Sequence, residues 1–315
     1  MKKILVIGSL NMDLVVKVDH NPVTGETIIG SSLDYIPGGK GANQAYTAGK
    51  LHSDVTMLGA VGDDANGQVL VNNLKNAGVD TSRILVKKNT PSGTALITVN
   101  KEGNNAITVV PGSNGKVTIE DIEDNIDLLE KSDIVVMQME IPIETVVYVA
   151  KKAKEMGKIV FLDPAPVPEK FPYEILPYLD FIKPNETEAA MLTSIKDTLS
   201  SYKQAAKLLR DKGVKNVAIT LGKEGVYLDS EKCGQCKIDA IDVKVVDTTA
   251  AGDSFTAAVA FAISNGKDYR TAVDFANKVS NVTVTKAGAQ TSVPTYEEVK
   301  EFYGEDPGIT YNINK

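Results

Sequence analysis

The chain has no tryptophan and few aromatic residues of any kind, which make up 6% of its 315 residues. Sparse aromatic residues argue against the stacking platforms that hold single-stranded nucleic acid. Excess positive charge is also lacking: the formal net charge is -7, and lysine and arginine are scattered along the chain. Because nucleic-acid backbones are bound by basic surfaces, the composition argues against a DNA- or RNA-binding protein.

Long apolar runs are absent too. The apolar run at the start of the chain covers only residues 4–7 before the sequence turns polar, so we do not interpret it as a secretory signal. No segment approaches the roughly 18 apolar residues of a membrane span. The two cysteines, Cys233 and Cys236, lie far in sequence from both histidines, which argues against a zinc site. We expect free thiols in the cytoplasm, with a redox-active pair as the alternative.

Short apolar runs alternate with stretches of helical character along most of the chain. The runs predicted as buried strands are 4–7, 55–61, 134–137, 159–162 and 217–221, and the predicted helices are 65–77, 118–130, 143–157 and 202–212. This alternation predicts an α/β fold with a parallel sheet covered on both faces. Strands from about 13–36 and 92–110 have no helix between them, which predicts a small separate sheet that acts as a lid.

The strongest local signal is the segment DTTAAGDSF at residues 247–255. It follows a strand-like run at 243–246, and its small residues open a predicted helix. A helix N-terminus offers unsatisfied N–H donors and partial positive charge, which suit a transferring phosphoryl group. Asp253 could there take the proton from an attacking hydroxyl, or it could simply complement the helix dipole.

A second segment, GGKGANQA at 38–45, places small residues before another predicted helix. It lacks the spacing of a Walker A loop, so by itself it predicts a closely packed helix start. Lys40 and Asn43 add hydrogen-bonding groups suited to a polyol. Asn11 and Asp13 follow the first strand, where parallel α/β sheets bind ligands, although both are also ordinary turn residues.

Three further strand ends carry polar or glycine residues. Glu140 is either a ligand or a solvated loop acid. The segment NETE at 185–188 is either a capped helix start or a set of residues that organise water around magnesium. The segment TLGKEG at 220–225 is either a hairpin turn or a loop that contacts phosphate. Their common placement at strand ends is a stronger argument for one site than any single segment.

Taken together, GGKGANQA, NETE and DTTAAGDSF resemble the ribokinase (PfkB-type) family of carbohydrate kinases, in order and spacing, over roughly residues 3–300. The resemblance implies a three-layer α/β/α sandwich with a mainly parallel central sheet and a small β-sheet lid. We expect this domain to span 1–303, followed by a C-terminal tail at 304–315. The resemblance also implies Mg-ATP, a monovalent cation such as K+, and a homodimer formed through the lid.

The family's functional residues can be carried over position by position. Asp253 matches the catalytic base, and the amides of Ala250, Ala251 and Gly252 match its anion hole. The positions that match the sugar contacts are Asn11, Asp13, Gly39, Lys40, Asn43, Glu140 and Asp253. Those that match the ATP site are Asn185, Glu188, Thr220, Gly222, Gly225, Gly252 and Asn277, with Glu188 also toward magnesium, through water. The loop that matches the monovalent-cation site contains Asp247, Thr249, Thr283, Lys286, Gly288 and Ser292.

The resemblance therefore implies transfer of the ATP γ-phosphoryl group to a sugar, and the first candidate is ribose, phosphorylated on O5. Another kinase of the same family, acting on deoxyribose, fructose or a nucleoside, is the nearest alternative. A sugar-binding regulator without catalysis is a second, against which the intact Asp253 argues. A dinucleotide-dependent oxidoreductase is a third, but the GxGxxG fingerprint is missing after the first strand.

Overall fold

The computed structural model describes residues 1–195, 198–304 and 309. An eight-stranded sheet in the order β14-β13-β12-β11-β10-β9-β1-β4 forms its centre. Its strands are β1 (Ile4–Ile7), β4 (Val55–Leu58), β9 (Ile134–Met137), β10 (Ile159–Leu162), β11 (Phe181–Ile182), β12 (Asn216–Thr220), β13 (Val226–Ser230) and β14 (Gly234–Ile238). The strands from β4 to β12 in this order run parallel, and the hairpin β13–β14 extends the sheet antiparallel.

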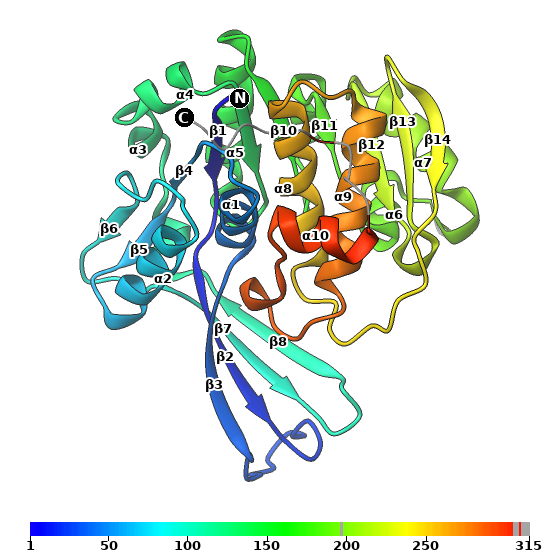
Figure 1. The fold of residues 1–315 in the computed structure, drawn as a ribbon. Coiled ribbons are helices and arrows are strands. Elements are labelled where there is room, and N and C mark those ends of the chain that lie inside the picture. Colours follow the sequence, from blue (N-terminus) through cyan, green and yellow to red (C-terminus); the bar gives the residue numbers. More distant parts are fainter. Residues whose placement is uncertain (196–197, 305–308, 310–315) are drawn as a thin grey trace.

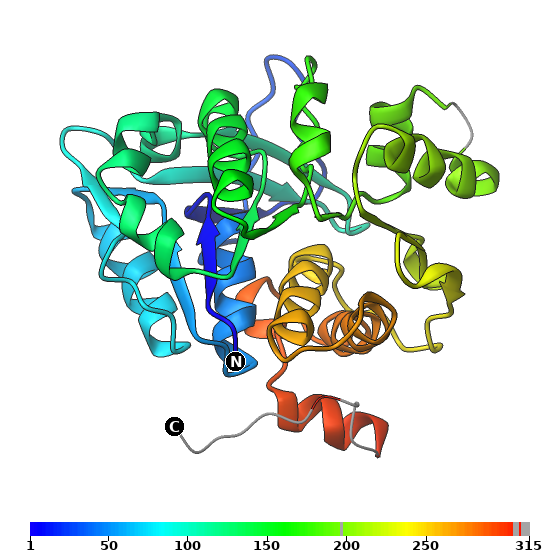
Figure 2. The ribbon, with the colours of Figure 1, turned by 90° about the horizontal axis from the view of Figure 1, so that it is seen from above.

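The parallel strands of this sheet are buried on both faces, which is why most of them are apolar runs, whereas the edge strand β14 is largely exposed. In β1, Ile4 and Val6 belong to one hydrophobic core, and Leu5 and Ile7 belong to the other. The helices on the first core are α1 (Lys40–Lys50), α2 (Ala65–Asn76), α8 (Ala251–Ser264), α9 (Tyr269–Thr283) and α10 (Tyr296–Tyr303). Those on the second are α3 (Ile119–Glu123), α4 (Ile126–Lys131), α5 (Ile143–Glu155), α6 (Glu186–Thr193) and α7 (Thr198–Asp211). Figure 2 shows β1 between green α5 and orange α8 and α9, so the predicted three-layer sandwich is confirmed.

A second, four-stranded sheet projects from the edge at which the parallel strands end (Figure 1). Its order is β3-β2-β7-β8, and we call it the lid sheet. The strands are β2 (Asn11–Lys17), β3 (Ser32–Gly38), β7 (Gly93–Val99) and β8 (Asn105–Val110). The two central strands, β2 and β7, are parallel, and each outer strand pairs antiparallel with its neighbour. The expected small sheet beside the α/β body is therefore present.

Two predicted elements are divided in the structure. The run 55–61 breaks at Gly59, after which β5 (Ala60–Gly62) leaves the central sheet and pairs with β6 (Leu85–Lys87). The predicted helix 118–130 breaks at Asn125, whose side-chain amide donates to the carbonyl of Asp121 at 2.9 Å. Such a side chain competes with the helical backbone bonds, which explains the break.

The predicted strand at 243–246 is wrong. This segment has no strand partner, and Val245 and Val246 are 56% and 54% exposed. The N–H of Val246 instead donates to the carbonyl of Val284 at 2.8 Å, which ties the segment to the end of α9. β-branched composition predicted a strand here, but no neighbouring edge is available to pair with it.

The C-terminal segment follows α10. Residues 305–308 and 310–315 lie outside the described part of the chain, and so does most of the turn-rich tail expected there. Ile309 is described: it is buried, and its carbonyl accepts a hydrogen bond from the Tyr296 hydroxyl. Over the described residues, no helix combines the length and the apolar character that crossing a membrane requires.

Candidate active site

Polar side chains gather where the parallel strands end, directly beneath the lid sheet. Asp163 follows β10, Lys183 follows β11, and Glu140 lies shortly after β9. The N-termini of α1 and α8 reach the same place, because Asn43 and Gln44 of α1 hydrogen-bond Asp253 of α8. Strand ends are where parallel α/β sheets bind ligands, so this edge is the candidate site.

Asp253 is a buried carboxylate of this cluster. It lies in the first turn of α8 and is 6% exposed. The amide nitrogen of Asn43 donates to its Oδ2 at 2.9 Å, and that of Gln44 donates to its Oδ1 at 3.1 Å. Both oxygens are therefore held in position by α1, and Asp253 does more than complement a helix dipole.

Burial raises the pKa of Asp253 to about 6, against the opposing effect of the Lys40 charge. The carboxylate of Asp163 raises the pKa further, while the Asn43 hydrogen bond and the Lys183 charge lower it. A carboxylate with this pKa is mostly ionised at neutral pH and close to the optimum for a general base.

The start of α8 is shaped by Ala250, which adopts a left-handed conformation with φ of 60°. This turn lets the helix begin at Ala251, whose N–H donates to the carbonyl of Thr248 at 3.3 Å. The first N–H groups of a helix lack intrahelical acceptors, so those of Gly252 and Asp253 point toward the site edge. An anion is favoured at this position.

Asp13 and Lys40 carry opposite charges on the sugar side predicted from the sequence. Burial raises the pKa of Asp13 to about 7, and the nearby Glu140 and Asp253 add to this effect while Lys40 reduces it. Burial would lower the pKa of Lys40, but Asp253, Asp163 and other carboxylates outweigh it and keep the amine protonated.

Glu140 is not a solvated loop acid. Its Oε2 accepts from the Ser9 hydroxyl at 2.5 Å and from the backbone N–H of Lys40 at 3.0 Å, which binds it to the start of α1. Gly39, with φ of 89°, leads into this helix, and a Cβ there would lie 2.7 Å from the backbone nitrogen of Asn11. Only glycine allows the two segments to approach so closely.

Asn11 is held by a residue that the sequence did not single out. The side-chain amide of Asn114, in the 3-10 turn Gly112–Lys116, donates to the Oδ1 of Asn11 at 2.7 Å. The Oδ1 of Asn114 in turn accepts from the backbone N–H of Leu10 at 2.9 Å. Because its oxygen is already used, Asn11 presents its NH2 group as a donor.

The predicted nucleotide residues lie at the ends of β11 and β12. Asn185 caps α6: its Oδ1 accepts from the N–H of Glu188 at 2.8 Å, and the Oε2 of Glu188 accepts from the N–H of Asn185 at 2.8 Å. The capped helix start, one of the two interpretations of residues 185–188, is therefore present. Burial raises the pKa of Glu188 despite the opposing Lys183 charge. Asn185 also pairs with Thr220 as an isolated parallel bridge, which brings the two strand ends together.

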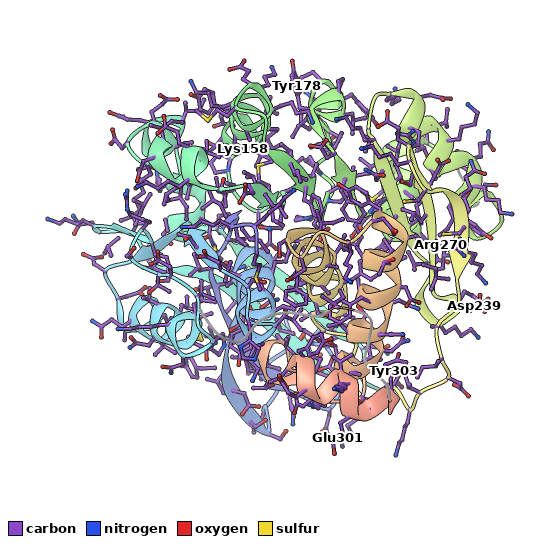
Figure 3. All side chains as sticks on the ribbon, turned by 45° about the horizontal axis from the view of Figure 1, so that its top comes forward. Lys158, Tyr178, Asp239, Arg270, Glu301 and Tyr303 are labelled. Carbon is purple, nitrogen blue, oxygen red and sulfur yellow. The ribbon has the colours of Figure 1, made fainter. Side chains whose placement is uncertain are left out.

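The segment 220–225 is a hairpin turn between β12 and β13. Gly222 and Gly225 both have positive φ, and a Cβ on Gly225 would lie 2.0 Å from the carbonyl of Ile238. Asn277 donates to the carbonyl of Asp239 at 3.0 Å, so it lies beside the same end of β14 (Asp239 is labelled in Figure 3). The structure thus brings the turn and Asn277 to one edge.

Two residues of the predicted cation loop, Thr249 and Gly288, hydrogen-bond the side chain of Asp247. Its Oδ1 accepts from the N–H of Thr249 at 2.9 Å, and its Oδ2 accepts from the N–H of Gly288 at 2.9 Å. Burial acts to raise the pKa of Asp247, but these hydrogen bonds lower it overall. The hydroxyl of Thr283 donates to that of Ser254 in α8 at 3.1 Å. The remaining contacts link Lys286 N–H to the Thr283 carbonyl and the Ser292 hydroxyl to the Ala289 carbonyl.

No group of three or more histidine, cysteine or acidic side chains that could hold a metal occurs among the described residues. Cys233 and Cys236 are both half-buried and free, at the β13–β14 hairpin.

Sequence reasoning missed several buried polar residues of the site. Asp163 accepts from Gln44 at 3.1 Å and pairs with Lys183 at 2.9 Å, and Gln138 donates to Gln44 at 2.6 Å. Gln290 donates to the Oδ1 of Asn43 at 3.0 Å. Asp163 directly follows the predicted strand 159–162, so the strand-end rule used for Asn11 could have found it.

The chain was compared with known proteins. Residues 1–296 match the model of the pfkB family carbohydrate kinases. The chain belongs to this family. It is 42% identical to "Ribokinase" of Bacillus subtilis, over 96% of this chain and 99% of that protein. It is 35% identical to "Deoxyribokinase" of Salmonella typhimurium, over 95% and 98% of the two chains.

Among solved structures, the Arabidopsis thaliana ribokinase complexed with ribose and ATP matches with a TM-score of 0.88. The identity is 33%, and the match covers 95% of this chain and 98% of that one. As a member of the pfkB family, this chain is a carbohydrate kinase, and the predicted enzyme class is confirmed. The family assignment gives a chemical meaning to a buried carboxylate beside a helix N-terminus.

Proposed function

We propose that this pfkB-family kinase phosphorylates D-ribose on its terminal hydroxyl, giving D-ribose 5-phosphate and ADP. The observation that carries the proposal is the Asp253 carboxylate, fixed by Asn43 and Gln44 at the amide-rich start of α8. Ribokinases are among its most similar relatives, and one neighbouring structure contains ribose and ATP. The chain therefore combines a poised base with the fold of ribose-binding enzymes.

In the proposed reaction, the sugar O5 attacks the γ-phosphorus of ATP in line. Asp253 accepts the O5 proton as the new P–O bond forms, and the bond to ADP breaks. The amides at the start of α8, from Ala250 to Asp253, stabilise the charge on the phosphoryl oxygens. Lys40 remains protonated and adds positive charge beside Asp253. The lid sheet excludes water, which otherwise competes as the acceptor.

The proposed sugar site is formed by Asn11, Asp13, Gly39, Lys40, Asn43 and Glu140. Asp13, when ionised, accepts two hydroxyl hydrogens, and the NH2 group of Asn11 donates to a neighbouring hydroxyl. Support for this pairing comes from Asn114, which occupies the Asn11 oxygen. A sugar with both 2- and 3-hydroxyls satisfies these groups, whereas loss of the 2-hydroxyl leaves one unpaired, at about 1–3 kcal/mol.

The proposed ATP site uses Asn185, Glu188, Thr220, Gly222, Gly225 and Asn277, with the amide of Gly252. Magnesium fits here as a companion of the phosphates, because Glu188 and Asn185 supply hard oxygen atoms and Mg2+ keeps several waters. When bound, it neutralises charge on the phosphoryl oxygens. A monovalent cation such as K+ fits the carbonyl-rich loop that includes Asp247, Thr249, Thr283, Lys286, Gly288 and Ser292.

We also propose a homodimer formed through the lid sheet, in a domain that spans residues 1–303. The support is its exposed apolar residues: Leu33, Tyr35, Leu96, Ile107, Val109 and Val110, which are 46–59% exposed. A cytoplasmic location is proposed on the two free thiols and on the supply of ATP there.

A coupled ADP-release assay tests the substrate assignment. D-ribose, 2-deoxyribose, fructose and adenosine are compared, each with and without potassium. Ribose is expected to give the highest kcat/KM, and omission of potassium is expected to lower it. A ribose rate well below that of another sugar overturns the assignment and leaves the family intact. Sugar binding without any ADP formation favours the non-catalytic regulator instead.

A further inference from the structure

A buried ion pair lies beneath the site and has no place in the mechanism above. Lys183 and Asp163 are 4% and 1% exposed, and the Nζ of Lys183 lies 2.9 Å from the Oδ2 of Asp163. Lysine is almost never this buried unless it is paired. The two residues follow β11 and β10, which are neighbours in the sheet, so the pair lies at the edge where the site is built.

The pair is connected to Asp253 through one amide group. The Nε2 of Gln44 donates to the Oδ2 of Asp163 at 3.1 Å and to the Oδ1 of Asp253 at 3.1 Å. Gln138 donates to the Oε1 of Gln44 at 2.6 Å, which fixes which end of the amide faces the carboxylates. An amide NH2 group only donates, so this arrangement is satisfied when both carboxylates are acceptors.

Lys183 also approaches the helix that carries Asp253. A Cβ added to Gly252 would lie 2.9 Å from the Nζ of Lys183, so the amine lies against the first turn of α8. The pair therefore approaches Asp253 in two ways. Asp163 is linked to Asp253 through Gln44, and Lys183 lies against Gly252, the residue before Asp253.

We infer that Lys183 and Asp163 are positioning residues for phosphoryl transfer, which act through Gln44 to keep Asp253 oriented and ionised. The inference rests on the proposed role of Asp253 as the base. Asp163 provides the acceptor that orients Gln44, but alone its charge repels that of Asp253. Lys183 cancels this repulsion, so the paired arrangement holds the base without adding net charge.

Other charged groups also face Asp253. Lys40 approaches from α1, and Asp13 approaches from β2 of the lid sheet. Neither Lys40 nor Asp13 is altered when Lys183 or Asp163 is replaced. A shift in the pKa of Asp253 in these variants is therefore assigned to the Lys183–Asp163 ion pair. Opposite charges must produce opposite shifts.

The test is the pH dependence of kcat at saturating ribose in wild type, K183M, D163N and the double variant D163N/K183M, because bound ribose engages Asp13 and leaves Asp253 as the group that titrates in the proposed mechanism. In K183M the Asp163 charge is uncompensated, so the acid limb is expected to move up by on the order of one pH unit. In D163N the Lys183 charge is uncompensated, so the limb is expected to move down. The double variant removes both charges and is expected to return the limb close to that of wild type.

Lys154 supplies the matched control. It pairs with Asp180 at 2.7 Å, at the opposite end of β11, and the two side chains are 26% and 11% exposed. K154M breaks a comparable ion pair away from the site, so it is expected to leave the acid limb in place. Circular dichroism melting of every variant separates loss of fold from loss of the base. If K183M does not fold, D163N and the double variant still give the sign of the effect.

Opposite shifts in the single variants, reversed in the double variant, support the inference. Acid limbs that stay fixed, or that move in the same direction in both single variants, overturn the inference. The proposed function still stands in that case, provided that the wild type phosphorylates ribose. A KM for ATP that rises equally in K183M and the double variant, with fixed limbs, also overturns it and makes Lys183 a phosphate contact. If the wild type forms no ADP in response to ribose, the proposed function is wrong, and this inference, which rests on it, is wrong as well.

Discussion

The strands of the central sheet bury apolar side chains on both faces, whereas strand β8 of the lid sheet has all of its residues exposed. The central sheet is covered by helices on each face, so its own packing determines its position. In the lid sheet, Leu33 and Tyr35 of β3 and Ile107 of β8 remain in contact with solvent. The body therefore has hydrophobic cores of its own, whereas the lid sheet leaves large apolar side chains exposed.

The candidate site lies across this boundary. Asp13 belongs to the lid sheet, while Lys40 and Asp253 belong to the body. Register partners place Ile36, Ala95 and Val109 beside Asp13 on one face of the lid sheet. The residues proposed for sugar recognition thus lie in both regions, and the groups proposed for phosphoryl transfer are in the body alone. Four substitutions test this division.

The largest effect is expected from Asp253→Asn, which removes the proposed base from the body. Turnover is expected to fall by at least ~10²-fold, because the O5 proton then has no acceptor, while ribose binding stays measurable. Steady-state kinetics and calorimetric ribose titration check both parts. Asp229→Asn, another buried aspartate of the central sheet, is the control and is expected to keep its activity. Near-normal turnover of Asp253→Asn contradicts the assignment.

The second prediction concerns Asp13, whose pKa is raised to about 7 by burial and nearby carboxylates. Only the ionised form accepts two hydroxyl hydrogens, so the kcat/KM for ribose is expected to fall as pH drops below about 7. Asp13→Asn is expected to lower kcat/KM by roughly 10- to 100-fold, as for a lost buried hydrogen bond, and to flatten this part of the profile.

Asp13 also affects stability, with a definite sign. Its pKa is higher in the folded state than the ordinary 3.8, so ionising it disfavours the fold as pH rises from 3.8 toward about 7. Asp13→Asn is expected to raise the melting temperature at pH 8 and to give no gain near pH 4. Asp34→Asn, at an exposed position of β3, is the control. A melting temperature that falls at pH 8 would contradict the assigned burial.

A smaller effect on catalysis is expected from Ile107→Glu, which places a charge on the lid sheet. The proposed homodimer is expected to dissociate because an unpaired charge is costly in an apolar interface, and the KM for ribose is expected to rise on the order of tenfold. Light scattering and kinetics measure these changes. Val69→Glu, on an exposed part of α2, is the control. A wild-type protein that is monomeric at micromolar concentration contradicts the proposed dimerisation through the lid sheet.

The smallest effect is expected when Cys233 and Cys236 are both replaced by serine, far from either region of the site. Both thiols are free and half-buried, so activity is expected to stay within about twofold and stability within about 0.5 kcal/mol. The same kinetics, repeated with and without reductant, measure the change. A large change with reductant in wild type, absent in the variant, would favour the redox-active alternative.

The layered body was predictable from the sequence because its signal is local. Runs such as 134–137 and 159–162 are apolar on both faces of the sheet, and they stand alone between helical stretches. The run at 243–246 is rich in valine but contains Lys244, and it forms no strand in the structure. Composition reports a preference, and only the neighbours in space decide whether a strand forms.

Site residues that lie in a recognisable sequence motif could be predicted, whereas contacts between residues far apart in the sequence could not. Asp253 and Asn43 lie in recognisable segments, but the contact between them joins residues 210 positions apart. Asp163 follows a strand that was predicted, but nothing local shows that it pairs with Lys183. The amide of Gln44 is another such case, because its two acceptors come from different elements of the fold.

The lid sheet joins the body through four chain crossings, near Asn11, Gly38, Gly93 and Val110. Two compact segments, 11–38 and 93–110, therefore contain the whole sheet, and neither includes Asp253, Asn185 or Thr220. A change inside these two segments therefore alters the surroundings of Asn11 and Asp13, and it leaves in place the residues of the body that are proposed for phosphoryl transfer.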